Sequence, residues 1–427
     1  MDVATPVPEQ LRWNFSLYSL VYAINHGAVT APLVLATATL DGNVGYRGDA
    51  LLYVFTLISS FLLAAPVVEC LDIKRASMLA MLLYTTYSAF FALALLLADR
   101  FGMWLQLLLF CTGSSVGGLA AGIFWAAQGA YFSRSVDLLV ESELSQREDL
   151  TSELSGKFAF FYLLFDLICK LLWSALDWSG VPPWLIASLY TAVGFLTLIP
   201  MSQTLNLSST SRSSGTSSMQ RMKATASLWK DPAIFLIGGL NLTFGFSAAL
   251  MNGYVNGEFT AKQLGSFAVA MLAALTSLTA ALVSNFLGPV GARIGKGPIV
   301  FFGAVCCFLG IPFSILSLGC CKSWGWWLTT LYLLQGGGRG VFESTNKGVF
   351  SDFFPEDPTA AFANQQLQTT MAFALCFFLS ERLKEEILAY IVLLTSLMTP
   401  LGFWLAGTLR HKIYQSEESD ESCAESN

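Results

Sequence analysis

Two pairs of opposite charges lie inside stretches of the sequence that are otherwise apolar. Asp166 and Lys170 form the first pair, and Arg339 and Glu343 form the second. Residues four apart share one face of a helix, so each pair can form an ion pair. The first pair has the favourable order, acid before base, which favours a structural ion pair that fixes packing. The second pair has the reverse order, which leaves its groups freer to bind a solute or to lock against another helix.

Further polar and aromatic residues accompany these charges in the apolar stretches. They are Asn25, His26, Trp125, Gln128, Asn241 and Asn346. The amides could hydrogen-bond a polar ligand and Trp125 could form a pocket wall, with plain packing as the alternative. A lone histidine is more often a core residue, yet His26 with Glu343 is the one candidate for a proton relay. We expect this set, with Arg339 and Glu343, to line a substrate cavity.

Enzyme, metal and cofactor chemistry has no support in the sequence. The motifs HExxH and the P-loop do not occur, and only two histidines are present. A net charge of −6 without a basic patch argues against nucleic acid as a partner. The nine cysteines form no CxxC pair; Cys320 and Cys321 could pair with something, but plain filler is favoured. We therefore predict no catalytic residues, no metal and no cofactor.

Composition predicts that the charged pairs lie in membrane-spanning helices. The chain is 54% hydrophobic and 12% charged, with a mean hydropathy of +0.59. Its apolar runs approach the ~20 residues that a helix needs to cross a bilayer. We predict an all-α, polytopic membrane protein with twelve spans at roughly 15–37, 50–70, 76–98, 103–132, 157–177, 183–201, 232–252, 264–287, 298–318, 325–351, 360–380 and 387–409.

The distribution of basic residues predicts the orientation of these spans. With the N-terminus in the cytosol, fifteen Lys and Arg residues fall on the cytoplasmic side and six on the other. Cytoplasmic loops carry the excess of Lys and Arg in membrane proteins. We therefore expect both termini to be cytoplasmic. The sequence does not distinguish a plasma membrane from an endolysosomal or vacuolar one.

The sequence also repeats itself. A shift of 218 positions lays Gly122 on Gly340 and Arg75 on Arg293. We predict a six-helix half at residues 1–201, a flexible cytoplasmic linker at 202–231, a second six-helix half at 232–409 and an acidic disordered tail at 410–427. Such a duplication is typical of the major facilitator fold, in which two halves face each other across a central cavity.

Two segments carry a resemblance to a known family. FWAAQGAYFSRS (124–135) and AAFANQQLQ (360–368) resemble signatures of the uncoordinated-93-like proteins, a branch of the major facilitator superfamily. The resemblance implies a transporter fold and two possible activities. The first is alternating-access movement of a small polar or ionic solute across a lipid bilayer. The second is a non-transporting role as accessory subunit or trafficking chaperone of a channel or receptor.

Overall fold

The computed structural model describes residues 7–41, 43–143, 147–207, 218–317, 323–356 and 358–425, and each regular element in these ranges is a helix. Ten of these helices are long and apolar enough to cross a membrane. Two further long helical stretches are not among these ten. One, at residues 329–353, contains Arg339, Glu343, Lys347 and Asp352, and the other, Pro358–Ser380, has no charged residue but is rich in Asn, Gln and Thr. Length, apolarity and number of helices make this chain a multi-pass integral membrane protein.

Seven helices form the first bundle. They are α1 (Pro8–Thr39), α2 (Val44–Ile58), α3 (Ala64–Leu71), α4 (Ile73–Glu143), α5 (Arg147–Trp178), α6 (Pro183–Leu196) and α7 (Leu198–Gln203). A π-helical segment, Ser59–Leu63, joins α2 to α3 in one span. Helix α4 contains two spans, because Gly102 has a φ of 73° and breaks the helical path there.

The second bundle contains the helices from α9 onward, and α8 (Ser218–Ser227) precedes it. Its helices are α9 (Ala233–Leu236), α10 (Gly239–Leu250), α11 (Ala261–Leu264), α12 (Ser266–Ile294), α13 (Lys296–Phe301), α14 (Gly310–Ser317), α15 (Thr329–Val341), α16 (Lys347–Phe353), α17 (Pro358–Ser380) and α18 (Glu385–Glu425). Segments Met251–Thr260, Phe302–Phe308 and Phe342–Asn346 are π-helical, and Leu228–Lys230 and Gly325–Leu328 are 3₁₀-helical.

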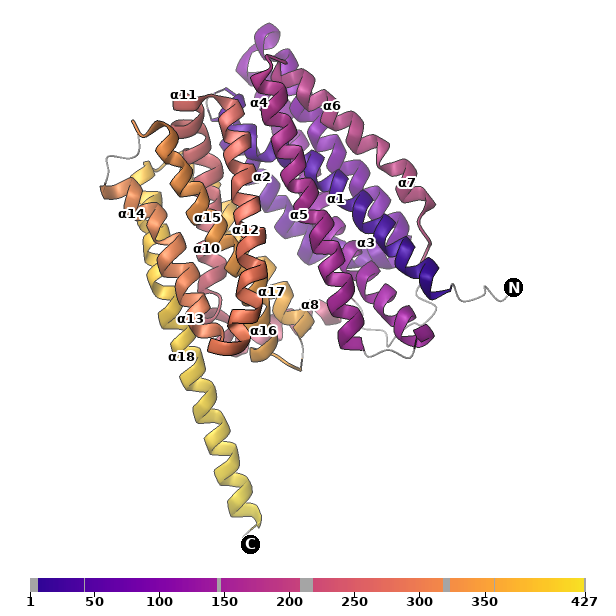
Figure 1. Ribbon diagram of the computed structural model, residues 1–427, viewed down its shortest axis with the longest axis vertical. Coiled ribbons are helices and arrows are strands. Elements are labelled where there is room, and N and C mark those ends of the chain that lie inside the picture. The colour runs from indigo at the N-terminus through magenta and orange to yellow at the C-terminus, as the bar shows by residue number, and fades with distance from the viewer. Residues whose placement is uncertain are drawn as a thin grey trace.

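The two bundles lie side by side, with α5 and α12 at the seam (Figure 1). Helix α2 packs against α17, and α5 packs against α12. The most enclosed spans are α1 and Ala233–Leu264, with 83% and 72% of their most apolar windows buried, against 56% or less in the other candidate spans. These two spans therefore occupy the centre of the molecule.

The structure differs from the sequence predictions in two polar segments. The predicted linker contains helix α8, and residues 208–217 of it lie outside the described residues, as do Cys320 and Cys321. The predicted disordered tail is helical through Glu425, and α18 projects beyond the bundle in Figure 1. Glu and Gln are good helix formers, so a polar segment that follows a spanning helix can continue it without packing partners.

Polar contacts join the bundles at the end where α1 finishes, here called the Thr37 end. The opposite end is called the Lys347 end. Thr37 donates to the Asn252 carbonyl at 2.6 Å, and Asn256 donates to the Val34 carbonyl at 3.1 Å. The Asn residues belong to the π-helical segment Met251–Thr260, whose irregular backbone is satisfied by α1. The bundles are thus closed against each other at the Thr37 end.

An exposed ion pair also joins the bundles at this end. Arg47 Nε donates to Glu381 Oε1 at 2.9 Å, and a second guanidinium nitrogen contacts the same oxygen. The hydrogen bond from Arg47 lowers the pKa of the Glu381 carboxyl below its ordinary value.

Acid is expected to release this ion pair. Because folding lowers the pKa of Glu381, its ion pair stabilises the folded protein at pH values above the ordinary glutamate pKa of about 4.3. This stabilisation is lost as the pH falls through the pKa of Glu381 in the folded state. The pair is partly exposed, so its loss should cost at most about 1 kcal/mol, and less in high salt. Thermal unfolding of wild type and Glu381→Gln across this pH range measures the difference. Parallel curves at every pH would contradict the prediction.

Candidate functional site

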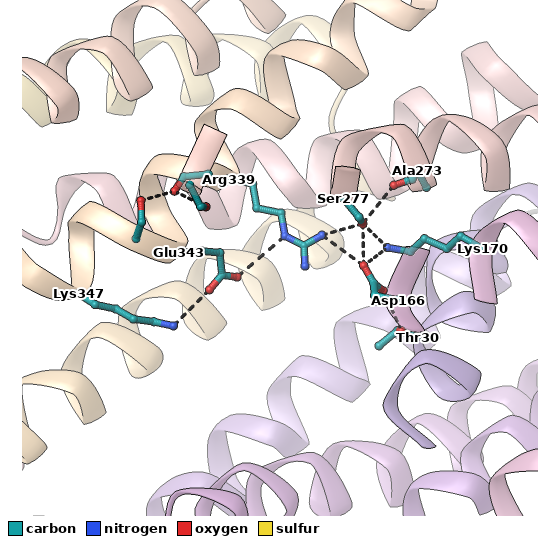
Figure 2. Close-up of polar contacts among 11 residues, drawn as sticks. Thr30, Asp166, Lys170, Ala273, Ser277, Arg339, Glu343 and Lys347 are labelled. Carbon is teal, nitrogen blue, oxygen red and sulfur yellow. Dashed lines mark hydrogen bonds and ion pairs between the residues drawn. The ribbon is translucent and has the colours of Figure 1, made fainter. Parts of the chain in front are cut away.

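A network of charges lies at the seam between the bundles (Figure 2). Asp166 Oδ2 accepts hydrogen bonds from Lys170 Nζ at 2.8 Å and from Ser277 Oγ at 2.6 Å. The Ser277 hydroxyl in turn accepts from Lys170 at 3.0 Å and from Arg339 Nη1 at 3.3 Å. Arg339 Nη1 lies 3.7 Å from Asp166 Oδ2. The two charged pairs predicted from the sequence therefore meet in one network that spans both bundles.

The network continues toward the Lys347 end and becomes more exposed on the way. Arg339 Nε lies 3.9 Å from Glu343 Oε1, and Lys347 Nζ lies 3.3 Å from Glu343 Oε2. Side-chain exposure rises from 4% at Asp166 to 16% at Arg339, 32% at Glu343 and 55% at Lys347. The buried part can act as a lock, because its charges are paired and hydrogen-bonded. The part around Arg339 and Glu343 is the more exposed part of the network.

Aromatic side chains of the first bundle border this network. The ring of His26 lies 5.0 Å from that of Tyr162 and 5.3 Å from that of Trp125. Tyr162 lies near Arg339 across the seam. An arginine beside aromatic rings offers both hydrogen-bond donors and an apolar wall, as polar-ligand sites often do.

The glycines before Arg339 place α15 close to its neighbours. A Cβ added at Gly336 would lie 2.8 Å from the carbonyl oxygen of Thr276 in α12. A Cβ added at Gly118, 218 positions earlier, would likewise lie too close to the Leu52 carbonyl oxygen of α2. Small residues let helix backbones approach closely in membranes. Equivalent glycines therefore set helix spacing in both bundles, whereas Arg339 and Glu343 have uncharged counterparts 218 positions earlier, Ala121 and Trp125.

A π-helical turn positions Glu343. The segment Phe342–Asn346 follows α15 directly and precedes α16. π turns inside α-helices are rare and are frequent at functional sites.

Asn25 is directed into the first bundle and away from the charge network. Its amide nitrogen lies 3.0 Å from Thr85 Oγ1 and 3.2 Å from the Gly194 carbonyl. Because these acceptors belong to α4 and α6, Asn25 holds three helices of one bundle together.

Asn241 and Asn346 likewise bind each other inside the second bundle. Asn346 Nδ2 donates to Asn241 Oδ1 at 2.6 Å, and Asn241 Nδ2 donates to Gln368 Oε1 at 2.7 Å. Both asparagines are buried, with 1% exposure or less. Their hydrogen bonds serve packing between three helices.

Among the described residues, no hydrogen bond joins His26 to Glu343, the two residues predicted to form a proton relay. The His26 carbonyl accepts from Thr30 Oγ1 at 2.9 Å, and Thr30 also lies 3.4 Å from Asp166 Oδ1. Gln128 is half-buried on α4, three residues after Trp125. His26, Trp125, Arg339 and Glu343 are thus the predicted cavity residues that lie around the network.

Sequence reasoning missed two members of the site. Tyr162 lies four residues before Asp166, so the helical repeat alone places it on the same face. Ser277 gives no such signal, because an isolated serine in an apolar stretch is common and its partner is 111 residues away.

Comparisons with known proteins agree with this architecture. No protein-family model matches the chain. It is 23% identical over 399 residues to protein unc-93 homolog A of Bos taurus, covering 83% of each chain. It is 20% identical to protein unc-93 homolog A of Xenopus laevis, covering 90% of this chain and 92% of that protein.

Solved transporter structures share the fold. A mutant of the nucleoside transporter NupG matches with a TM-score of 0.66 at 12% identity, covering 93% of this chain and 99% of that one. A D-xylose–proton symporter also gives 0.66, at 13% identity and with 93% and 98% covered. A bacterial homologue of the iron transporter ferroportin, in an inward-facing state, gives 0.65 at 16% identity and the same coverage. The predicted fold and resemblance are confirmed: this chain has the fold of these solved transporters and is similar to unc-93 homolog A proteins over most of its length.

Proposed function

We propose that this protein moves a small polar or ionic solute across a membrane by alternating access. The solute binds between Arg339 and Glu343 of the second bundle and Tyr162, Trp125 and His26 of the first. The observation that carries this proposal is the graded exposure of the charge network toward the Lys347 end, combined with closure at the Thr37 end. A transporter needs a central site that opens to one side while the other is sealed.

The proposed orientation places the Lys347 end in the cytosol. The excess of Lys and Arg in the loops at that end supports it. Division of the chain into halves at 202–231 stays part of the proposal. The extended contacts of α1 with α5 and of α12 with α15 support two separately packed units.

Replacing Glu343 with Gln is expected to weaken solute binding about 10- to 100-fold, because hydrogen bonds to a charged group contribute about 1.5–3 kcal/mol. A thermal-shift screen against amino acids, sugars, nucleosides and inorganic ions identifies the solute, and uptake into liposomes measures the effect.

A matched control exists at the other end of the molecule. Glu258 also pairs with a lysine four residues later, Lys262, but on the exposed surface of the Thr37 end. Glu258→Gln should leave uptake unchanged. Wild-type uptake by a folded Glu343→Gln variant would remove Glu343 from the site.

The second candidate function is that of an accessory protein for a channel or receptor, as the resemblance to unc-93 proteins implies. A groove of about 790 Å³ between α13 and α18 favours it, lined by Gly297, Pro298, Phe301, Pro400, Phe403, Trp404, Gly407, Thr408 and His411. Its small residues would accept a ridge of a partner's transmembrane helix. This function predicts a co-purifying membrane protein that is lost when Gly407 is replaced by Leu, with no solute giving a thermal shift.

A further inference from the structure

Asp49 is a fully buried carboxyl group that the charge network does not use. Its side chain is 0% exposed, and both carboxylate oxygens are without a hydrogen-bond partner among the described residues. An ionised carboxylate in a membrane-spanning helix is strongly disfavoured unless a cation or several donors neutralise it. The surroundings of Asp49 thus accommodate the neutral, protonated form of the group.

The polar groups near Asp49 are hydroxyls. Gly48 packs against Phe110 and Ser114 of α4, and a Cβ at Gly48 would lie 3.0 Å from Ser114 Oγ. The Phe110 ring lies 5.9 Å from that of Tyr87, whose hydroxyl lies near Asp49. The Tyr87 and Ser114 hydroxyls are also buried and unpartnered in the described structure. Such hydroxyls can accept a hydrogen bond from a carboxylic acid but cannot neutralise a carboxylate.

Among the described residues, no hydrogen bond joins Asp49 to a charged side chain. The charged residues of α4 lie at least ten positions along the chain from Tyr87, Phe110 and Ser114; those described are Lys74, Arg75, Arg100, Arg134, Asp137 and Glu141. Glu258 of the second bundle is exposed and pairs with Lys262.

On the helix that carries Asp49, Tyr46 and Tyr53 lie near it, and the ion pair of Arg47 lies toward the surface. Helix α17 contains no charged residue, and its Cys376 interacts with Tyr46. The titratable residues of α1 are two tyrosines, Tyr18 and Tyr22, and Glu9, Arg12 and His26, and all of these precede the Ala36–Thr37 stretch that contacts α2.

Helix α2 also forms part of the closure between the bundles. Three residues before Asp49, the Tyr46 ring packs on Gly253 of the second bundle. Four residues after it, the Tyr53 ring stacks on Phe373 at 4.4 Å. Residues three and four apart lie on one helix face, so the seal and Asp49 share a side of α2.

We propose that Asp49 is a proton-binding site whose proton exchanges with water only when the Thr37 end opens. The proton comes from water at that end, binds one carboxylate oxygen, and returns to the same water on release. Opening of the Thr37 end rests on the proposed alternating access. Proton binding itself does not depend on it.

Infrared difference spectroscopy tests whether Asp49 carries a proton at neutral pH. Wild type minus Asp49→Asn is expected to show the carbonyl band of a protonated carboxyl group at neutral pH. Asn is nearly isosteric with the neutral acid, so the variant should fold. Asp41→Asn, which removes an exposed carboxyl near the start of α2, should show only carboxylate bands. A carboxylate signal from Asp49 at neutral pH would overturn the site.

Hydrogen–deuterium exchange of the Asp49 carboxyl proton, followed by the shift of its carbonyl band, tests whether exchange needs opening of the Thr37 end. A variant with Arg47→Cys and Glu381→Cys is compared in D₂O with and without a short bifunctional thiol reagent that holds the Thr37 end closed. The band should shift at least ~10-fold more slowly after cross-linking, since the site then stays sealed. Equal exchange rates would show that the Asp49 proton exchanges without opening of the Thr37 end. That result would overturn the proposed link between proton exchange and opening. Both measurements remain informative if the protein transports no solute.

Discussion

Replacement of Asp166 by Asn is expected to destabilise the protein by about 3–5 kcal/mol, the cost of breaking a buried ion pair on one side. Asp166 is the only described acid that contacts both Lys170 and Arg339. Without its charge, these two cations lie near each other and share only the Ser277 hydroxyl. Arg339 keeps its contact with Glu343, but Lys170, with a side-chain exposure of 6%, is left without a carboxylate partner among the described residues. Unfolding of the purified protein by heat or denaturant measures the loss.

The lysine of the same network provides the comparison. Lys170→Met removes one cation but leaves Arg339 to neutralise Asp166, so its cost should be clearly smaller. The double variant Asp166→Leu with Lys170→Leu should recover much of the stability, because buried ion pairs are often replaceable by apolar residues. A larger loss in Lys170→Met than in Asp166→Asn would contradict the described pairing.

Cross-linking the bundles at the Thr37 end is expected to abolish solute uptake. Arg47 and Glu381 are 46% and 26% exposed and belong to different bundles, so cysteines in their places are accessible to a bifunctional thiol reagent. Alternating access requires this end to open, and a covalent link prevents it. A reagent with a reducible spacer should restore uptake once reductant is added. The native cysteines are replaced first, because Cys70 is exposed.

The same variant tests orientation. In cells that carry the protein in their plasma membrane, a membrane-impermeant reagent added outside should cross-link the pair, because the Thr37 end is proposed to face away from the cytosol. Single variants Arg47→Cys and Glu381→Cys, treated alike, should keep their uptake. Full uptake after complete cross-linking would exclude alternating access at this end and favour an accessory function.

The fold was predictable from sequence because bilayer thickness and hydropathy constrain spanning helices strongly. The pairing of Asp166 with Lys170 was also predictable, since a spacing of four fixes the shared face. The helical repeat does not say which neighbour that face meets. For this reason Asn25, predicted to line the cavity, instead binds Thr85 within the first bundle. The carboxyl of Asp49 escaped notice because the predicted second span began at residue 50, whereas α2 begins at Val44.

The π turn at Phe342–Asn346 has a consequence for how the site can change. A π turn contains one residue more than an α turn of the same height. If the extra residue is absorbed into regular α geometry, every residue beyond it rotates by about 100° and shifts by about 1.5 Å along the axis. Glu343 and Lys347 would stay neighbours, because residues four apart share one face of a regular α-helix. A different side of α16 beyond them would face the seam, so the second bundle can change the surface that it presents there without unfolding a helix.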